Sequence, residues 1–127
     1  MKKLQNFVNG KLVDSSSGET TTLINPATGQ AFATAPNSNA ADVDKAMSAA
    51  AGAFTEWRDS TPSERQRALL KIADAIESRA DEIIAIESEN CGKPIGLTTS
   101  EEFPPMIDQI RFFAGAARNL EGKSAGE

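Results

Sequence analysis

The chain has 127 residues, with 13 basic against 18 acidic side chains and a net charge of −5. Because nucleic acids and anionic membranes are bound by clustered Lys and Arg, this acidic and scattered charge argues against both partners. The sequence holds no His, which excludes His-activated nucleophiles and His-bearing zinc sites within the chain.

The sequence contains a single cysteine, Cys91, which cannot form an intrachain disulfide. The N-terminal residues are followed by no apolar run of the length that a signal peptide or a membrane span requires. We therefore expect the chain to be cytoplasmic.

The first 35 residues carry the signals of short strands. An Asn-Gly dipeptide at positions 9 and 10 lies between apolar segments, and this is the strongest short-range signal for a β-hairpin. It predicts a hairpin over residues 4–13. Residues 20–24 are rich in β-branched side chains, and the turn-forming residues 25–29 separate them from a short extended segment at 31–35. We expect four short strands in all.

The next segment is expected to be a helix that ends near Trp57. Asn39 and Asp42 stand three residues apart, as in a helix N-terminal cap. Apolar side chains then recur at the three- and four-residue spacing of one helix face. They are Val43, Ala46, Met47, Ala50, Phe54 and Trp57.

Residues 61–94 contain the most complete helical pattern in the chain. Thr61 and Glu64 form a capping box, with Pro62 at the first helical position. The Gly-Lys-Pro run at 92–94 ends the pattern, because Gly accepts the left-handed cap conformation and Pro cannot continue the ladder. Residues 78–81 can divide the pattern into two helices. The face expected to be buried holds Leu69, Ile72, Ala73, Ile76, Ala80, Ile83 and Ile84.

A third helix is expected after a connector at residues 95–100. Pro104 and Pro105 fit only in its first turn, because Pro cannot donate a helical hydrogen bond. Its expected core stripe is Met106, Ile110, Phe113, Ala117 and Leu120. The polar tail at 121–127 is expected to be a loop or an unfinished strand.

The order of these elements favours the α/β class, with short antiparallel hairpins followed by three or four amphipathic helices and a predominantly helical chain. No alternation of strand, helix and strand is visible, so no parallel sheet is complete. Four short strands cannot cover all the apolar helix faces. We therefore expect a piece of a larger α/β domain.

Six short motifs follow one another along the chain. They are Phe-Val-Asn-Gly-Lys at 7–11, Ile-Asn-Pro-Ala-Thr-Gly at 24–29, Asp-Val-Asp-Lys-Ala at 42–46, Trp57 before Thr-Pro-Ser-Glu-Arg at 61–65, Asn-Cys-Gly-Lys-Pro at 90–94, and Arg-Phe-Phe-Ala-Gly at 111–115. In this order they resemble the N-terminal part of NAD-dependent aldehyde dehydrogenases. Residues 89–95 and 111–120 look most like the bacterial γ-aminobutyraldehyde dehydrogenases.

The resemblance implies that residues 1–127 are the N-terminal part of a cofactor-binding domain. The nucleotide loop, the catalytic domain and the oligomerisation strands of such enzymes lie beyond this segment. The resemblance therefore implies no catalytic and no cofactor-binding residue here, although the parent enzyme would use NAD and form a homo-oligomer, specifically a homotetramer. Cys91 is expected to be a small buried thiol rather than the nucleophile, since no His is present to activate it.

The resemblance also implies a possible site for a monovalent cation. In similar betaine and aminoaldehyde enzymes, backbone oxygen near the 25–29 turn and an acidic side chain before Gly-Lys bind such an ion. The matching positions are the carbonyl of Leu23 or Ile24 and the side chain of Asn90, where a neutral amide replaces the acid. Oxygen ligands suit a hard cation. The alternative is that residues 25–29 form only a tight turn.

For substrate binding, the resemblance implies Glu102 and Asp108, and Phe112 is a further candidate because only one member of the Phe112-Phe113 pair falls on the expected core stripe. An aldehyde with an ammonium group needs a carboxylate near its far end, and similar aminoaldehyde dehydrogenases use acids in this helix. The alternative is that Glu101, Glu102 and Asp108 belong to a solvated first turn that offsets the helix dipole. Phe113 is expected to lie in the core, whereas Phe112 would face a substrate channel or a neighbouring layer.

The expected function is oxidation of 4-aminobutanal or a related ω-aminoaldehyde to the acid with NAD. We expect the 127-residue chain alone to be inactive. The alternative, from another functional class, is an autonomous helical interaction module that binds a partner through an exposed stripe.

Overall fold

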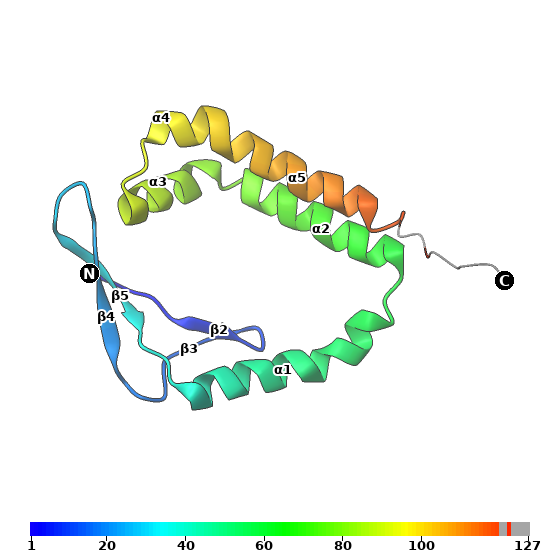
Figure 1. Ribbon diagram of the computed structural model, residues 1–127, viewed down its shortest axis with the longest axis horizontal. Helices are drawn as coiled ribbons and strands as arrows, with labels where there is room; N and C mark the ends of the chain where they lie inside the picture. Colours follow the sequence, from blue (N-terminus) through cyan, green and yellow to red (C-terminus); the bar gives the residue numbers. More distant parts are fainter. Residues whose placement is uncertain (120–121, 123–127) are drawn as a thin grey trace. The chain divides into compact units, whose positions relative to one another are not determined.

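A computed structural model of the chain describes residues 1–119 and 122. The predicted core position Leu120 and most of the predicted tail, 121 and 123–127, lie outside the described residues. The chain divides into two compact units: unit 1 is Met1–Asp59 with Glu89–Gly92, and unit 2 is Ser60–Ser88 with Lys93–Glu127. Figure 1 labels the helices and strands of both units. Within the described residues, no helix is long and apolar enough to cross a membrane.

Unit 1 contains all the strands of the described chain. They are β1 (Lys2–Lys3), β2 (Asn6–Val8), β3 (Lys11–Val13), β4 (Thr20–Ile24) and β5 (Ala31–Pro36). The antiparallel pair β2-β3 forms one sheet, and a second sheet has the order β1-β5-β4. The predicted strands are confirmed. Strand β1, which pairs in parallel with β5, was not predicted because two lysines carry no strand pattern.

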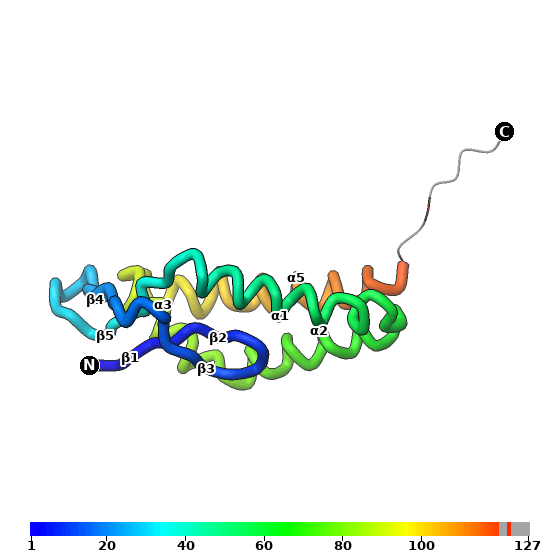
Figure 2. Tube along the Cα trace, turned by 90° about the horizontal axis from the view of Figure 1, so that it is seen from below, coloured from blue at the N-terminus to red at the C-terminus, as the bar shows by residue number. Residues whose placement is uncertain are grey.

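The tight turn between β2 and β3 explains why this hairpin could be predicted. Asn9 and Gly10 have φ angles of 50° and 76°, the left-handed conformation that a two-residue type I′ turn demands at both central positions. The turn sets the register, with Phe7 opposite Leu12. Figure 2 shows β2 and β3 side by side, joined at this turn.

Helix α1 (Ala40–Arg58) completes unit 1. Its predicted cap is confirmed: the Asp42 amide donates to Asn39 Oδ1 and the Asn39 amide donates to Asp42 Oδ2, each at 3.1 Å. None of the residues of α1 is buried. Four apolar side chains of its expected core face are each more than half exposed, namely Val43, Met47, Phe54 and Trp57. The helix is therefore as predicted, but its apolar face is uncovered.

The helices of unit 2 begin with α2 (Pro62–Glu77), which is followed by α3 (Ala80–Cys91). The Glu64 amide donates to Thr61 Oγ1 at 3.2 Å, and the Thr61 amide donates to a Glu64 carboxylate oxygen at 2.7 Å. This capping box and the division of the run near residues 78–81 are both as predicted. The last residues of α3 group with unit 1.

The expected connector at 95–100 is wrong, because the chain there is helical throughout. Helix α4 (Ile95–Leu97) runs into a π-helical segment, η1 (Thr98–Glu102), and then into α5 (Phe103–Ala116). Three hydroxyl groups donate to backbone carbonyls four residues earlier, at 2.8 to 3.2 Å; they belong to Thr98, Thr99 and Ser100. Such bonds let residues that usually favour turns sit in a helix.

The π-helical segment is separated by one residue from Pro104 and Pro105, which occupy the first turn of α5 as predicted. A proline cannot donate to the carbonyl four residues earlier, and its ring crowds that carbonyl. Wider π-helical turns relieve this crowding at Ser100 and Glu101. The prolines thus change the helix type without ending the helix.

The core of unit 2 is formed by α2, α3 and α5, and α2 and α5 run side by side in Figure 1. Its buried cluster is Ala73, Ile84, Phe103 and Ile107, flanked by Ile76, Ala80, Ile83 and Ile110. The expected face of α2 and α3 is confirmed for most of its members. Ile72 is an exception, since half of its surface is exposed.

The expected core stripe of α5 is confirmed at Ile110, which packs against the core, but it is wrong at Met106 and Phe113. Phe103, Ile107 and Ala114 are buried, whereas Met106 and Phe113 are exposed. Both sets follow helical spacing and both run past Ile110, so α5 carries two neighbouring apolar stripes. Periodicity alone could not tell which stripe faces α2.

Candidate functional site

The expected cation ligands all lie in unit 1. Leu23 is partly buried and Ile24 is half exposed at the end of β4. Leu23 pairs with Ala33 of β5, but Ile24 pairs with Ala31, so the register slips by one residue between them. Slips of this kind disturb the hydrogen-bond ladder and redirect backbone groups.

The segment at the end of α3 that contains Asn90 meets the turn after β4 at Gly92. Gly92 has a φ angle of +72°, and a Cβ atom added to it would lie 2.9 Å from Cγ of Pro26. The turn after β4 and the end of α3 therefore touch at a position that requires Gly. Within the described residues, no group of three His, Cys, Asp or Glu could hold a metal ion. A cation here would depend on backbone and amide oxygens, which fit a weakly held monovalent ion better than a transition metal.

Cys91 is exposed, so the expectation of a buried thiol is wrong. It is the last residue of α3, and Asn90 Nδ2 lies 3.7 Å from its sulfur. The helix-ending motif predicted where the helix stops, but not which side chain of its final turn would face the solvent.

Glu102, the main expected substrate-binding residue, belongs to an ionic cluster in unit 2. Its Oε2 lies 2.6 Å from Nζ of Lys93, and Oε1 of Glu87 lies 3.1 Å from the same Nζ. Hydrogen bonds to Glu102, and then to Glu87, raise the pKa of Lys93 to about 12. The lysine therefore stays an ammonium at neutral pH. Two carboxylates and one ammonium leave the cluster with one net negative charge.

The other two expected substrate-binding residues lie further along α5. Asp108 and Phe112 are both exposed and stand four residues apart, so they share one face of the helix. The rings of Phe112 and Phe113 meet edge to face, with centroids 5.3 Å apart and an interplanar angle of 85°. Phe113 is 61% exposed, so its expected place in the core is wrong. The ion pair of Glu102 is made with Lys93 and involves neither Asp108 nor Phe112.

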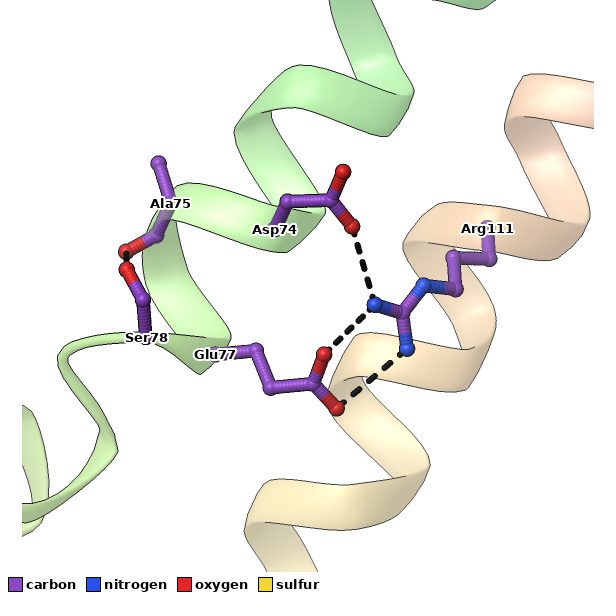
Figure 3. Close-up of polar contacts among 5 residues, drawn as sticks. All are labelled: Asp74, Ala75, Glu77, Ser78 and Arg111. Atoms are coloured by element: carbon purple, nitrogen blue, oxygen red, sulfur yellow. Dashed lines mark hydrogen bonds and ion pairs between the residues drawn. The ribbon is translucent and has the colours of Figure 1, made fainter.

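A clamp between α2 and α5 fixes the helix that carries these residues. Arg111 Nη2 lies 3.0 Å from Asp74 Oδ1 and 2.6 Å from Glu77 Oε2. Its Nη1 donates to Glu77 Oε1 at 3.3 Å, so the guanidinium meets Glu77 with two nitrogens (Figure 3). These bonds raise the pKa of Arg111 and lower that of Glu77. No local pattern could predict the clamp, because Arg111 lies 34 and 37 residues from its two partners.

Comparisons with known proteins agree with this architecture. The profile of the aldehyde dehydrogenase family matches residues 12–127. The protein DhaS of Bacillus subtilis (strain 168) is 41% identical over 125 residues, which are 97% of this chain and 25% of that protein.

Solved structures give the same result. An NAD-dependent aldehyde dehydrogenase from Sinorhizobium meliloti is 38% identical with a TM-score of 0.90, covering 97% of this chain and 25% of its own. PnpE in complex with nicotinamide adenine dinucleotide is 35% identical with a TM-score of 0.93, covering 98% of this chain and 26% of its own.

The chain belongs to the aldehyde dehydrogenase family, and its mixed α/β fold matches the N-terminal part of that family's fold. It spans about a quarter of the length of the relatives described above. The alternative of an autonomous interaction module is not favoured, because the family match extends over most of the chain.

Proposed function

We propose that this chain is the N-terminal part of the cofactor-binding domain of an NAD-dependent aldehyde dehydrogenase. The observation that carries the proposal is the family match over residues 12–127. NAD, bound by the remainder of the enzyme, would accept the hydride from the aldehyde. The described residues would form scaffold around the cofactor domain and one wall of the substrate tunnel, in a homo-oligomeric enzyme.

We further propose an ω-aminoaldehyde such as 4-aminobutanal as the substrate, with Glu102 near its ammonium group. The support is the cluster around Glu102, which already holds one primary ammonium group, that of Lys93, at 2.6 Å. The cluster keeps one net negative charge, and its side chains remain partly exposed. Asp108 and Phe112 would extend this wall along one face of α5. Phe112 would contact the methylene chain of the substrate, because its ring is mostly exposed.

We also propose that a monovalent cation binds near the end of β4, with the carbonyl of Leu23 or Ile24 and the amide oxygen of Asn90 as ligands. The support is the contact between Gly92 and Pro26, which brings the Asn90 run beside the turn after β4. Because Asn90 is neutral, the site would bind its ion weakly. Such an ion would stabilise the junction of the strand turn with the end of α3 and would take no part in the chemistry.

The test of the substrate proposal is Glu102→Gln in the full-length enzyme, which keeps shape and hydrogen bonding but removes the charge. A partly exposed ion pair contributes on the order of 1 kcal/mol, so kcat/KM for 4-aminobutanal should fall by about fivefold. Butanal has the same length and no ammonium group, so its kcat/KM should hardly change. A parallel fall for both aldehydes would show that Glu102 supports the helix instead of the substrate. The selective loss should shrink at high salt, because screening weakens an exposed charge contact.

A further inference from the structure

We propose that Lys93 is a specificity-determining residue that competes with the substrate ammonium group for Glu102. Its removal should therefore strengthen, not weaken, the preference for aminoaldehydes. This inference rests on the proposed function, because it concerns the same carboxylate. A lysine in an ion pair beside a substrate site would ordinarily be expected to support substrate binding. We expect the opposite for Lys93: its replacement should increase activity toward aminoaldehydes.

The geometry places Lys93 where a substrate ammonium group would have to bind. Its Nζ lies between Glu87 of α3 and Glu102 of η1, at 3.1 and 2.6 Å. The Glu102 side chain makes no capping hydrogen bond at the start of α5; its hydrogen bond in the described chain is the one from Lys93. The carboxylate that the substrate would need is therefore already engaged.

The cluster is nevertheless open to solvent. The side chains of Lys93 and Glu102 are 35% and 42% exposed, so a charged group can approach the pair from water. Lysine is a compact point charge on a flexible stem, and it can move aside more easily than a bidentate arginine. The exchange of one ammonium group for another is therefore feasible at this position.

Tethering gives Lys93 the advantage in this exchange. Its ammonium group is held by the chain at a high effective concentration, whereas the substrate ammonium group arrives from dilute solution. Lys93 also follows Gly92, which has a constrained left-handed backbone, and precedes Pro94, so its own backbone has little freedom to withdraw. The net charge that attracts the substrate is thus one unit, where Glu87 and Glu102 alone would provide two.

The experiment measures one ratio, kcat/KM for 4-aminobutanal divided by kcat/KM for butanal, in the full-length enzyme. Lys93→Met keeps a long unbranched side chain and removes the charge, so the ratio should rise by about two- to fivefold, mainly through KM. Lys93→Arg keeps the charge and should leave the ratio at or below the wild-type value, because arginine moves aside less easily than lysine.

Glu87→Gln makes the opposite change. Lys93 would then pair with Glu102 alone, the cluster would become neutral, and the ratio should fall by about twofold or more. The matched control is Arg79→Met, which removes a cation from another exposed ion pair of unit 2, that between Arg79 and Glu82 at 2.8 Å. The control should not change the ratio.

An unchanged or lower ratio in Lys93→Met, with wild-type kcat for butanal, would overturn the inference. If Lys93→Met does not fold, Glu87→Gln is the deciding variant: a fall in the ratio supports the inference, and no fall overturns it.

The substrate proposal fails separately, if wild type prefers butanal and Glu102→Gln leaves the ratio unchanged. In that case Lys93→Met should leave the ratio unchanged as well, whereas a lower ratio in Glu102→Gln together with an unchanged ratio in Lys93→Met would overturn the inference alone.

Discussion

Helices α1 and α5 start from the same kind of sequence pattern and end in different surroundings. Both carry apolar side chains at three- and four-residue spacing, yet α1 buries none of its residues, whereas α5 buries Phe103, Ile107 and Ala114. This difference shows that the spacing of apolar residues predicts a helix and its faces, but not which segment packs against them. Helix α5 is covered by α2 within unit 2, whereas unit 1 buries no residue of α1. This agrees with a chain that spans a quarter of its relatives.

The largest effect should come from the covered helix. Phe103 is 8% exposed and packs in the core cluster of unit 2, so Phe103→Ala in the full-length enzyme should cost about 3 to 5 kcal/mol of unfolding free energy. Phe112→Ala is the matched control, since the same ring is removed from the same helix where it is 68% exposed. It should cost less than about 1 kcal/mol. Denaturant midpoints with equal losses for the two variants would mean that the buried face of α5 is misassigned.

A smaller effect should come from the contact between Gly92 and Pro26 in unit 1. Gly92→Ala places a Cβ in a left-handed conformation and 2.9 Å from the proline ring, so it should cost about 1 to 3 kcal/mol. Gly96→Ala is the control, because Gly96 lies in α4 with nothing within 4 Å of its added Cβ. Alanine is the better helix former, so this change should be neutral or stabilising by about 0.5 to 1 kcal/mol. Thermal unfolding in which both variants lose stability alike would refute the contact.

The smallest effect concerns the polar contacts between the segment after β3 and the start of α1 in unit 1. The Asp42 carboxylate accepts hydrogen bonds from the Ser16 amide at 3.0 Å and from Ser15 Oγ at 2.9 Å. The Ser16 bond is the main cause that lowers the pKa of Asp42 from 3.8 to about 2. Because the folded pKa lies below the unfolded one, this stabilisation is present above pH 3.8 and is lost as the pH falls to about 2.

This expectation can be checked by following the Asp42 carboxyl carbon by NMR during an acid titration. A midpoint near 2 would support the contacts, and a midpoint near 4 would contradict them. Asp42→Asn should make the free energy of unfolding depend less on pH within that pH window. Asp44→Asn, on the same helix, is the control and should leave the curve unchanged.

Much of this fold follows from local chemistry. The Asn9-Gly10 turn, the caps at Asn39 and Thr61 and the stop at Gly92 each depend on residues close in sequence, and each is confirmed. Features that depend on distant partners were missed. Strand β1 exists only through β5, and the choice of stripe on α5 depends on α2.

The candidate site likewise has residues that the sequence could indicate and contacts that it could not. A resemblance could point to Glu102, but its partner Lys93 lies nine residues away across a segment expected to be a connector. Only the helical path through η1 brings the two together. Likewise, nothing in the helix-ending motif could show that Cys91 would be exposed, because exposure depends on what packs beside that turn.

The most direct test of the proposed activity is NADH formation from aldehyde and NAD, measured for the full-length enzyme and for the 127-residue chain side by side. We expect the full-length enzyme to form NADH with 4-aminobutanal faster than with butanal, and the chain alone to form none above a blank. NADH formation by the chain alone, or none by the full-length enzyme with either aldehyde, would contradict the proposal.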